Sequence, residues 1–207
     1  MSNNLTIWIT GTSGFIGYRL YKSLLDEKLN IIQISLNFKN LIFNNWNDEK
    51  LKVQNYLDQR LKINNKPDII IHLGWGKMID PWSHYHIKEN VNKSIELFKF
   101  AKINQVKKII FCGSMNEYAD VSGPIHELTK TNKTNKIVTN YAKGKLKVTN
   151  YGLDLFNNSF TQFYVVRPSY VYGPGQKKSS LISQLFEAYR KSTSLDLTSC
   201  NSYRDYI

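Results

Sequence analysis

Short apolar runs alternate along the chain with longer segments in which apolar residues recur every three or four positions. The runs are rich in β-branched residues and lie at Leu5–Thr10, Ile31–Leu36, Asp68–Leu73, Lys108–Cys112 and Phe163–Val166. Short continuous runs of this kind are typical of parallel strands that are covered on both faces. The spaced segments predict helices at Phe15–Lys28, Asp48–Lys62, His86–Asn104, Asn140–Phe156 and Ser180–Ser192. The alternation predicts an α/β fold with a doubly wound parallel sheet.

Residues 120–139 carry neither pattern. They contain Gly and Pro, followed by a stretch rich in Thr, Asn and Lys. Such composition predicts a loop between the strand that ends at Cys112 and the next helix. A loop at that point would border the edge of the sheet where ligands bind.

The composition indicates one soluble unit. The 207 residues, 42% of them hydrophobic, can bury one substantial core. The two cysteines, Cys112 and Cys200, have no metal-ligand or redox spacing, which favours a reducing compartment without a disulfide. No apolar run approaches the roughly 20 residues that cross a bilayer, and the start lacks the pattern of a signal peptide. We therefore expect a cytoplasmic protein with no membrane partner and no metal.

The formal net charge of +12 raises the question of nucleic-acid binding. The lysines, however, are scattered from Lys22 to Lys191, and no basic stripe interleaved with aromatic residues is present. This distribution favours a solvated basic surface and no nucleic-acid partner. The charge could still attract an anionic nucleotide substrate.

A glycine-rich turn follows the first strand and opens the first helix. Gly11, Gly14 and Gly17 have a spacing that differs by one residue from the dinucleotide-binding fingerprint. Gly11 permits a tight turn, Gly14 lets the backbone approach phosphates, and Gly17 lets the helix pack closely. The segment predicts a pyrophosphate site, with further contacts from Ser13, Phe15 and Ile16.

Two later positions suggest proton chemistry. Tyr141 and Lys145 lie four residues apart and therefore on one face of a helix, where an ammonium can lower the pKa of a phenol. This makes Tyr141 a candidate proton shuttle. Ser114 follows the strand that ends at Cys112, so its hydroxyl would face a ligand at the carboxyl edge of the sheet. The alternative is a serine that only caps a turn.

These motifs, together with Pro67-Asp68-Ile-Ile-Ile-His-Leu, Tyr118, Arg167-Pro-Ser-Tyr-Val-Tyr-Gly-Pro-Gly175 and a final Arg204-Asp205-Tyr206-Ile207, occur in the order seen in one family. The chain resembles the extended short-chain dehydrogenases/reductases, in the NAD-dependent epimerase/dehydratase branch that acts on nucleotide sugars. The resemblance implies a Rossmann-like domain over residues 1–168 and the beginning of a substrate-binding lobe over 169–207. Members of the family continue well past this strand, so we expect the lobe to be incomplete.

The resemblance also implies roles for individual residues. Tyr141 would be the acid/base on a sugar hydroxyl or ketone, Ser114 would hold and polarise that oxygen, and Lys145 would bind the nicotinamide ribose. Further cofactor contacts are implied for Leu73, Gly74, Asn90 and Arg167, and substrate contacts for Asn116, Tyr170 and Tyr172. Asn90 matches a helix asparagine that supports the site through backbone or water contacts; its alternative is an ordinary polar helix residue.

The sequence departs from the family's dehydratases directly after Ser114. Those enzymes carry an Asp-Glu pair at the positions of Met115 and Asn116, neither of which exchanges protons usefully. Glu117 comes one residue too late and is expected to face elsewhere. Water elimination is therefore disfavoured, which leaves epimerisation or ketone reduction. His84 and His86 have no metal-ligand partners and are expected in packing or at the surface.

The end of the second strand bears on the cofactor. An acidic residue there would bind the adenosine ribose of NAD, but residues 32–39 contain none. Ser35, Asn37 and Lys39 could instead hold a 2′-phosphate, which slightly favours NADP over NAD.

Two functions remain open at this point. The first is an NAD(P)-dependent nucleotide-sugar epimerase or ketoreductase. The second is a truncated, non-catalytic dinucleotide-binding module, or half of a split enzyme that needs a second chain. The partners left open are a second copy in a homodimer and a complementing C-terminal chain.

Overall fold

The structure is a computed structural model that describes residues 5–25, 27, 29–35, 42–45, 49–52, 54–55, 66–119, 123–127, 129, 131, 137–197, 199 and 204–207. The chain forms two compact units, Met1–Arg167 and Pro168–Ile207. The sequence predicted a boundary one residue later, after 168. Parts of the predicted 120–139 loop lie outside the described residues.

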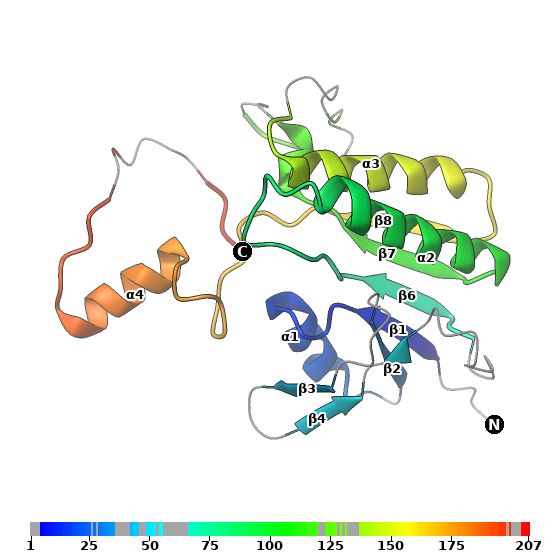
Figure 1. Cartoon of the computed structure of the whole chain (residues 1–207), viewed down its shortest axis with the longest axis horizontal. Helices are drawn as coiled ribbons and strands as arrows, with labels where there is room; N and C mark the ends of the chain where they lie inside the picture. Colours follow the sequence, from blue (N-terminus) through cyan, green and yellow to red (C-terminus); the bar gives the residue numbers. More distant parts are fainter. Residues whose placement is uncertain are drawn as a thin grey trace. The chain divides into compact units, whose positions relative to one another are not determined.

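The first unit is built on a six-stranded parallel sheet (Figure 1). Its strands are β1 (Thr6–Thr10), β2 (Asn30–Ser35), β5 (Gln54–Asn55), β6 (Ile69–His72), β7 (Lys108–Cys112) and β8 (Gln162–Val166). They lie in the order β5-β2-β1-β6-β7-β8. Because the order reverses between β1 and β6, a crevice for a dinucleotide is expected where these two strands end. The predicted doubly wound, Rossmann-like sheet is confirmed.

Four of the five predicted helices are present, one of them with a local change. They are α1 (Phe15–Leu24), α2 (Val91–Ile103), α3 (Asn140–Leu155) and, in the second unit, α4 (Leu181–Lys191). Ahead of α2, residues His86–Asn90 form a π-helical turn, η1, and a 3₁₀ turn, η2, spans Met115–Tyr118. The predicted helix at 86–104 is therefore divided, and its first turn is widened. Such π-helical turns occur often at functional sites.

The helix predicted at Asp48–Lys62 is wrong over its described part. Strands β3 (Ile42–Asn45) and β4 (Glu49–Lys52) pair antiparallel in a separate small sheet. Residues Gln54–Asn55 form β5, which pairs with the end of β2. The three-to-four spacing of apolar residues predicted a helix, but the segment pairs with other strands instead. The prediction failed because β-structure depends on neighbours that the local sequence does not specify. Residues 56–65 lie outside the described residues.

Helices cover both faces of the sheet, as its continuous apolar strands predicted. On one face Trp8 and Ile70 pack with Leu97 and Phe98 of α2 and with Val148 of α3. These two helices lie side by side over β7 and β8 (Figure 1). On the other face a second cluster includes Ile7, Ile9 and Ile71, with Leu20 and Leu24 of α1 packed against it. The alternation along β1 thus divides its side chains between two cores.

The edge strand β8 departs from the expectation of burial on both faces. Phe163 and Val165 pack against the core, whereas Tyr164 and Val166 are half exposed. Strand β8, which leads directly to Arg167, therefore packs on the core through one face only.

The second unit contains α4 and a short strand-like contact. Tyr170 and Tyr206 form a parallel bridge, and the Arg204 guanidinium donates a hydrogen bond of 3.0 Å to the Tyr170 hydroxyl. Helix α4 has no buried residue, and Phe186 and Tyr189 are exposed on it. Among the described helices of both units, none is long and apolar enough to cross a membrane.

Candidate active site

The glycine turn closes directly after β1. Gly11 has φ +78°, and a Cβ atom there would lie 2.7 Å from the backbone nitrogen of Gly74, so only glycine fits. A Cβ atom on Gly17 would overlap the carbonyl oxygen of Gly11, which means that Gly17 packs against the turn. By contrast, a Cβ atom on Gly14 would meet only that same carbonyl, at 3.3 Å, and would otherwise point into open space. Two of the glycines build the turn, and the third leaves room beside it.

The start of α1 suits an anion. Its N-cap is Gly14, which has no side chain to cap the helix, and the first turn contains no acidic residue. The N–H groups at this end carry the positive pole of the helix. Ser13 and Ile16 are exposed here, and Phe15 is partly so. A dinucleotide pyrophosphate fits this combination of open space and unused donors.

The end of β6 is fixed beside the turn by a chain of hydrogen bonds. The Gly74 N–H donates to the Thr10 hydroxyl oxygen at 2.9 Å, and that hydroxyl lies 2.7 Å from Nδ1 of His72. On the other ring edge, Nε2 of His72 lies 2.9 Å from the Ser94 hydroxyl, which itself donates to the carbonyl of Asn90. Ser94 must therefore accept, so His72 carries its proton on Nε2. Burial lowers the pKa of His72 to about 3, which keeps the ring neutral.

A second set of bonds holds the chain after Leu73 and Gly74. The Asn90 side chain accepts from the Gly76 N–H at 2.9 Å and donates to the Gly76 carbonyl at 3.0 Å. The Trp75 indole donates to Nδ1 of His86 at 2.9 Å, and Nε2 of His86 donates to the Asp80 carbonyl. Asn90 thus makes backbone contacts at the crevice, and His86 is a buried packing residue. The described residues contain no cluster of His, Cys, Asp or Glu that could hold a metal ion.

Lys145 is buried beneath this segment. Its ammonium donates to the carbonyl oxygen of Cys112 at 2.6 Å and lies 4.0 Å from the ring centre of Trp75. Burial lowers the pKa of Lys145 to about 8, against the opposing effects of Cys112 and Glu117. Gly144 makes this packing possible, because a Cβ atom there would lie 2.7 Å from the carbonyl oxygen of His86 and 3.2 Å from the Trp75 ring.

Tyr141 lies on the same helix, but its ionisation differs from the sequence expectation. Burial raises the pKa of the phenol, and only a hydrogen bond from the Ser114 side chain lowers it. The Lys145 ammonium is 6.0 Å from the centre of the Tyr141 ring, and it is directed toward Cys112. The expectation that Lys145 lowers this pKa is therefore wrong for the chain by itself, because burial outweighs the four-residue spacing.

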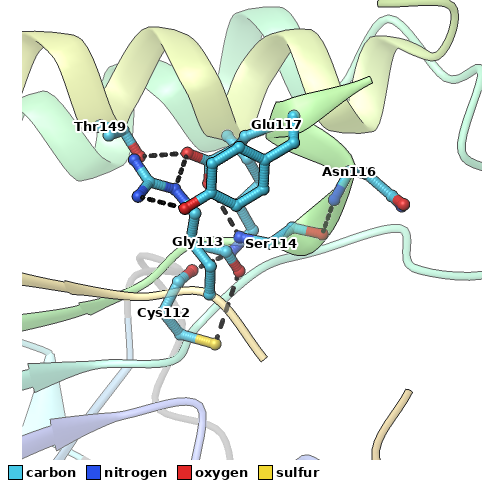
Figure 2. Close-up of polar contacts among 9 residues, drawn as sticks. Cys112, Gly113, Ser114, Asn116, Glu117 and Thr149 are labelled. Atoms are coloured by element: carbon cyan, nitrogen blue, oxygen red, sulfur yellow. Dashed lines mark hydrogen bonds and ion pairs between the residues drawn. The ribbon is translucent and has the colours of Figure 1, made fainter. Parts of the chain in front are cut away.

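Ser114 follows β7 and has the capping role that the sequence left as one of two alternatives, while its contact with a ligand stays a prediction. Its hydroxyl oxygen accepts from the Asn116 N–H at 3.2 Å, so it does cap the 3₁₀ turn. The same side chain lowers the pKa of Tyr141. Asn116 is exposed, and its side chain extends away from the neighbouring polar cluster (Figure 2).

Glu117 faces away from the Ser114 hydroxyl and into the core, as expected. The carboxylate is fully buried and pairs with Arg167, whose Nε lies 2.8 Å from Oε2. Arg167 also donates to the Tyr118 hydroxyl at 3.2 Å, and the cofactor contact implied for it stays a prediction. The sequence analysis missed this pair, although Ser114 and Glu117 have the Ser-x-x-Glu spacing of a capping box. It also missed Trp75, which stands just past the carboxyl end of β6.

The remaining predicted residues are Ser35, Asn37, Lys39, Tyr170 and Tyr172. Ser35 is the last residue of β2, while Asn37 and Lys39 lie outside the described residues. Tyr170 and Tyr172 belong to the second unit, where Tyr172 is 46% exposed. Cys112 is a free thiol whose pKa burial raises, and Cys200 lies outside the described residues.

A parallel sheet with this strand order and a glycine turn at its switch point is typical of dinucleotide-binding proteins. The family model described as "NAD dependent epimerase/dehydratase family" matches residues 7–207, and the chain belongs to that family.

Several known proteins are similar to the chain. A UDP-glucuronate 4-epimerase of Thermodesulfobacterium geofontis is 26% identical over 197 residues, which cover 80% of this chain and 56% of that protein. The structure of a UDP-N-acetylglucosamine 4-epimerase from Methanobrevibacter ruminantium M1 in complex with UDP-N-acetylmuramic acid has a TM-score of 0.75 at 23% identity, covering 99% of this chain and 69% of that one. The Bordetella bronchiseptica enzyme WbmG in complex with NAD has a TM-score of 0.77 at 19% identity, covering 100% and 65%. Because both structures are less than 25% identical to this chain, they show only that the fold is shared. The chain spans about half the length of the curated relatives that it matches.

Proposed function

We propose that the protein acts on a nucleotide sugar, as an epimerase or ketoreductase that uses Ser114, Tyr141 and Lys145. The observation that carries the proposal is the grouping of the three side chains: Tyr141 and Lys145 lie on α3 with the Lys145 ammonium 6.0 Å from the Tyr141 ring centre, and the Ser114 side chain lowers the pKa of Tyr141. This cluster stands at the carboxyl ends of the strands, as does the glycine turn. The similar structures that hold UDP-sugars support the choice of substrate class.

Each residue has one task in this mechanism. Tyr141 transfers the proton of a sugar hydroxyl or ketone, and Ser114 holds and polarises the same oxygen. Lys145 supplies a cation that would bind the nicotinamide ribose. A bound nicotinamide would accept or return the hydride. Because burial raises the pKa of Tyr141, a positive charge beside the phenol, such as that of an oxidised nicotinamide, would favour the oxidative direction.

Water elimination fits the site less well. Met115 cannot carry a proton, and Asn116 is an exposed amide. Glu117 is the acidic residue nearest in sequence to Ser114, and both of its oxygens accept hydrogen bonds within the core. Epimerisation or reduction at a carbinol carbon needs no such carboxylate.

The cofactor would be held by the glycine turn, with Gly14 and the start of α1 at the pyrophosphate. Similar structures hold NAD. The sequence at the end of β2 contains no carboxylate for the ribose of NAD, so NADP remains the proposed preference. The choice is tested by comparing the two affinities directly.

The mechanism is tested by Tyr141→Phe. Turnover with UDP-, GDP- or dTDP-sugars should fall by about 10² to 10⁴, because only the transferable proton is removed. Cofactor affinity should stay within about twofold, since the ring and its packing remain. Lys145→Met should weaken both turnover and cofactor binding.

The control is Tyr164→Phe, which removes a hydroxyl from the exposed face of β8. Unchanged turnover in Tyr141→Phe would contradict the mechanism. Dinucleotide binding without turnover of any of these sugars would instead support a binding module, or a part that needs a second chain.

A further inference from the structure

Glu117 is a charge in the core that the proposed mechanism does not use. Its exposed fraction is 0%. Transfer of a carboxylate from water to such a place costs several kcal/mol unless hydrogen bonds and an opposite charge compensate for it. In this protein three donors compensate for the burial of the carboxylate. Oε1 accepts from the Ser114 N–H at 2.8 Å, and Oε2 accepts from the Thr149 hydroxyl at 3.0 Å and from Nε of Arg167 at 2.8 Å (Figure 2).

The three donors come from the elements that build the site. Ser114 itself follows β7, Thr149 lies on α3 with Tyr141 and Lys145, and Arg167 follows β8. One carboxylate therefore sets the separation between the Ser114 backbone and the helix that carries the phenol. A shift of Ser114 away from α3 would break at least one bond to a buried charge.

The same carboxylate fixes the orientation of Ser114. In the capping box, Glu117 holds the Ser114 N–H while the Ser114 hydroxyl oxygen accepts from Asn116. The hydroxyl then has one hydrogen and one lone pair left for other partners, and this side chain lowers the pKa of Tyr141. Gly113 is necessary for this arrangement, because a Cβ atom there would overlap Oε1 of Glu117.

We propose that Glu117, paired with Arg167, is a positioning residue that aims the Ser114 hydroxyl at Tyr141. The proposal rests on the role given to Ser114 above. Glu117 transfers no proton in it, because both oxygens are engaged with protein donors.

The test separates the hydrogen bond from the buried ion pair. Glu117→Leu/Arg167→Met replaces the pair with apolar side chains of similar volume, a change that is often neutral for stability. It removes the acceptor of the Ser114 N–H. The matched control, Glu117→Gln/Arg167→Met, also removes both charges but keeps an amide oxygen at the same place. Ser114→Ala is then introduced into the wild type and into each double variant.

The readout is the Tyr141 Cζ resonance in ¹³C-tyrosine-labelled protein, assigned with Tyr141→Phe, because it does not require turnover. Ser114→Ala should move this resonance in the wild type and in the glutamine control but not in the leucine variant. If the protein turns over, Ser114→Ala should cost about 10- to 100-fold in the first two backgrounds and less than about twofold in the third. An equal shift of the resonance in all three backgrounds would overturn the proposal.

Hydrogen exchange of the wild-type Ser114 amide gives a second measurement that depends on no variant. A bond to a buried carboxylate should slow its exchange by at least about 10³-fold, and exchange at the rate of an exposed amide would overturn the proposal. If Ser114→Ala moves the Tyr141 resonance as expected while no sugar is turned over, the positioning role stands and the proposed function fails. If Ser114→Ala leaves the wild-type resonance unchanged, both fail.

Discussion

Replacing Lys145 with methionine should change how the stability of the protein depends on pH. The side chain is only 3% exposed, and burial lowers its pKa from 10.5 to about 8. The unfolded chain keeps the ordinary lysine value, so between these two pKa values the unfolded state binds more protons than the folded state. The free energy of unfolding therefore rises with pH through this window. Below about pH 8 the buried ammonium imposes its full cost.

The size of the effect follows from the two pKa values. Their difference, 10.5 − 8 = 2.5, corresponds to about 3 kcal/mol at roughly 1.36 kcal/mol for each tenfold change in proton affinity. Because the upper part of the window lies above pH 10, the gain between about pH 7 and pH 10 is about 2 to 3 kcal/mol. The Lys145→Met variant cannot be charged and should lack this gain.

The assay is equilibrium unfolding in urea, at several pH values between about 7 and 10, for both proteins. The difference in unfolding free energy between wild type and Lys145→Met should shift in favour of the wild type as pH rises. The range stops near pH 10 because burial raises the pKa of Tyr141, and ionisation of this tyrosine in the unfolded chain opposes the trend at higher pH. Parallel curves for the two proteins would show that the ammonium is not desolvated, and would refute the reasoning.

Three further outcomes are expected. Gly14→Val should abolish dinucleotide binding in a folded protein, because the valine side chain would fill the open space at the start of α1; calorimetry with NAD and NADP would detect any retained affinity. Gly17→Ala should instead lower the thermal midpoint, because the added Cβ atom would overlap the glycine turn. Ser35→Asp should shift selectivity toward NAD by more than about tenfold, since one charge-assisted contact contributes about 1.5–3 kcal/mol; a wild type that already binds NAD more tightly would contradict the NADP preference. Burial lowers the pKa of His72 from 6.5 to about 3, so the free energy of unfolding should fall as pH drops through that range. In His72→Gln the unfolding free energy should fall less steeply at acid pH, and an identical pH dependence would count against a buried neutral ring.

Local pattern was sufficient for the parallel strands and the glycine turn. Each of the five predicted strands lies in a short apolar run, which is typical of strands in a covered parallel sheet. The turn is equally local, since the left-handed conformation of Gly11 must follow the last residue of β1. The spacing of Tyr141 and Lys145 sets them on one helix by geometry alone.

The helix predicted at 48–62 failed because spacing of apolar residues cannot report which strand a segment will pair with. Residues Gln54–Asn55 form hydrogen bonds along the edge of β2, and that edge exists only once the sheet has formed. The outer face of β8 is a similar case, since its exposure depends on what packs there.

The sequence by itself therefore determined the order of the elements and the residues delivered to the carboxyl ends of the strands. Only the tertiary structure decided their chemical state, because the pKa of a side chain depends on burial and on partners distant along the chain. Burial reversed the expected direction of the Tyr141 pKa and lowered that of Lys145. The tertiary structure also brings Arg167 next to Glu117, 50 positions away along the chain. Glu117, which the sequence placed one position too late for the dehydratase pair, is thus a buried carboxylate that accepts from the Ser114 N–H.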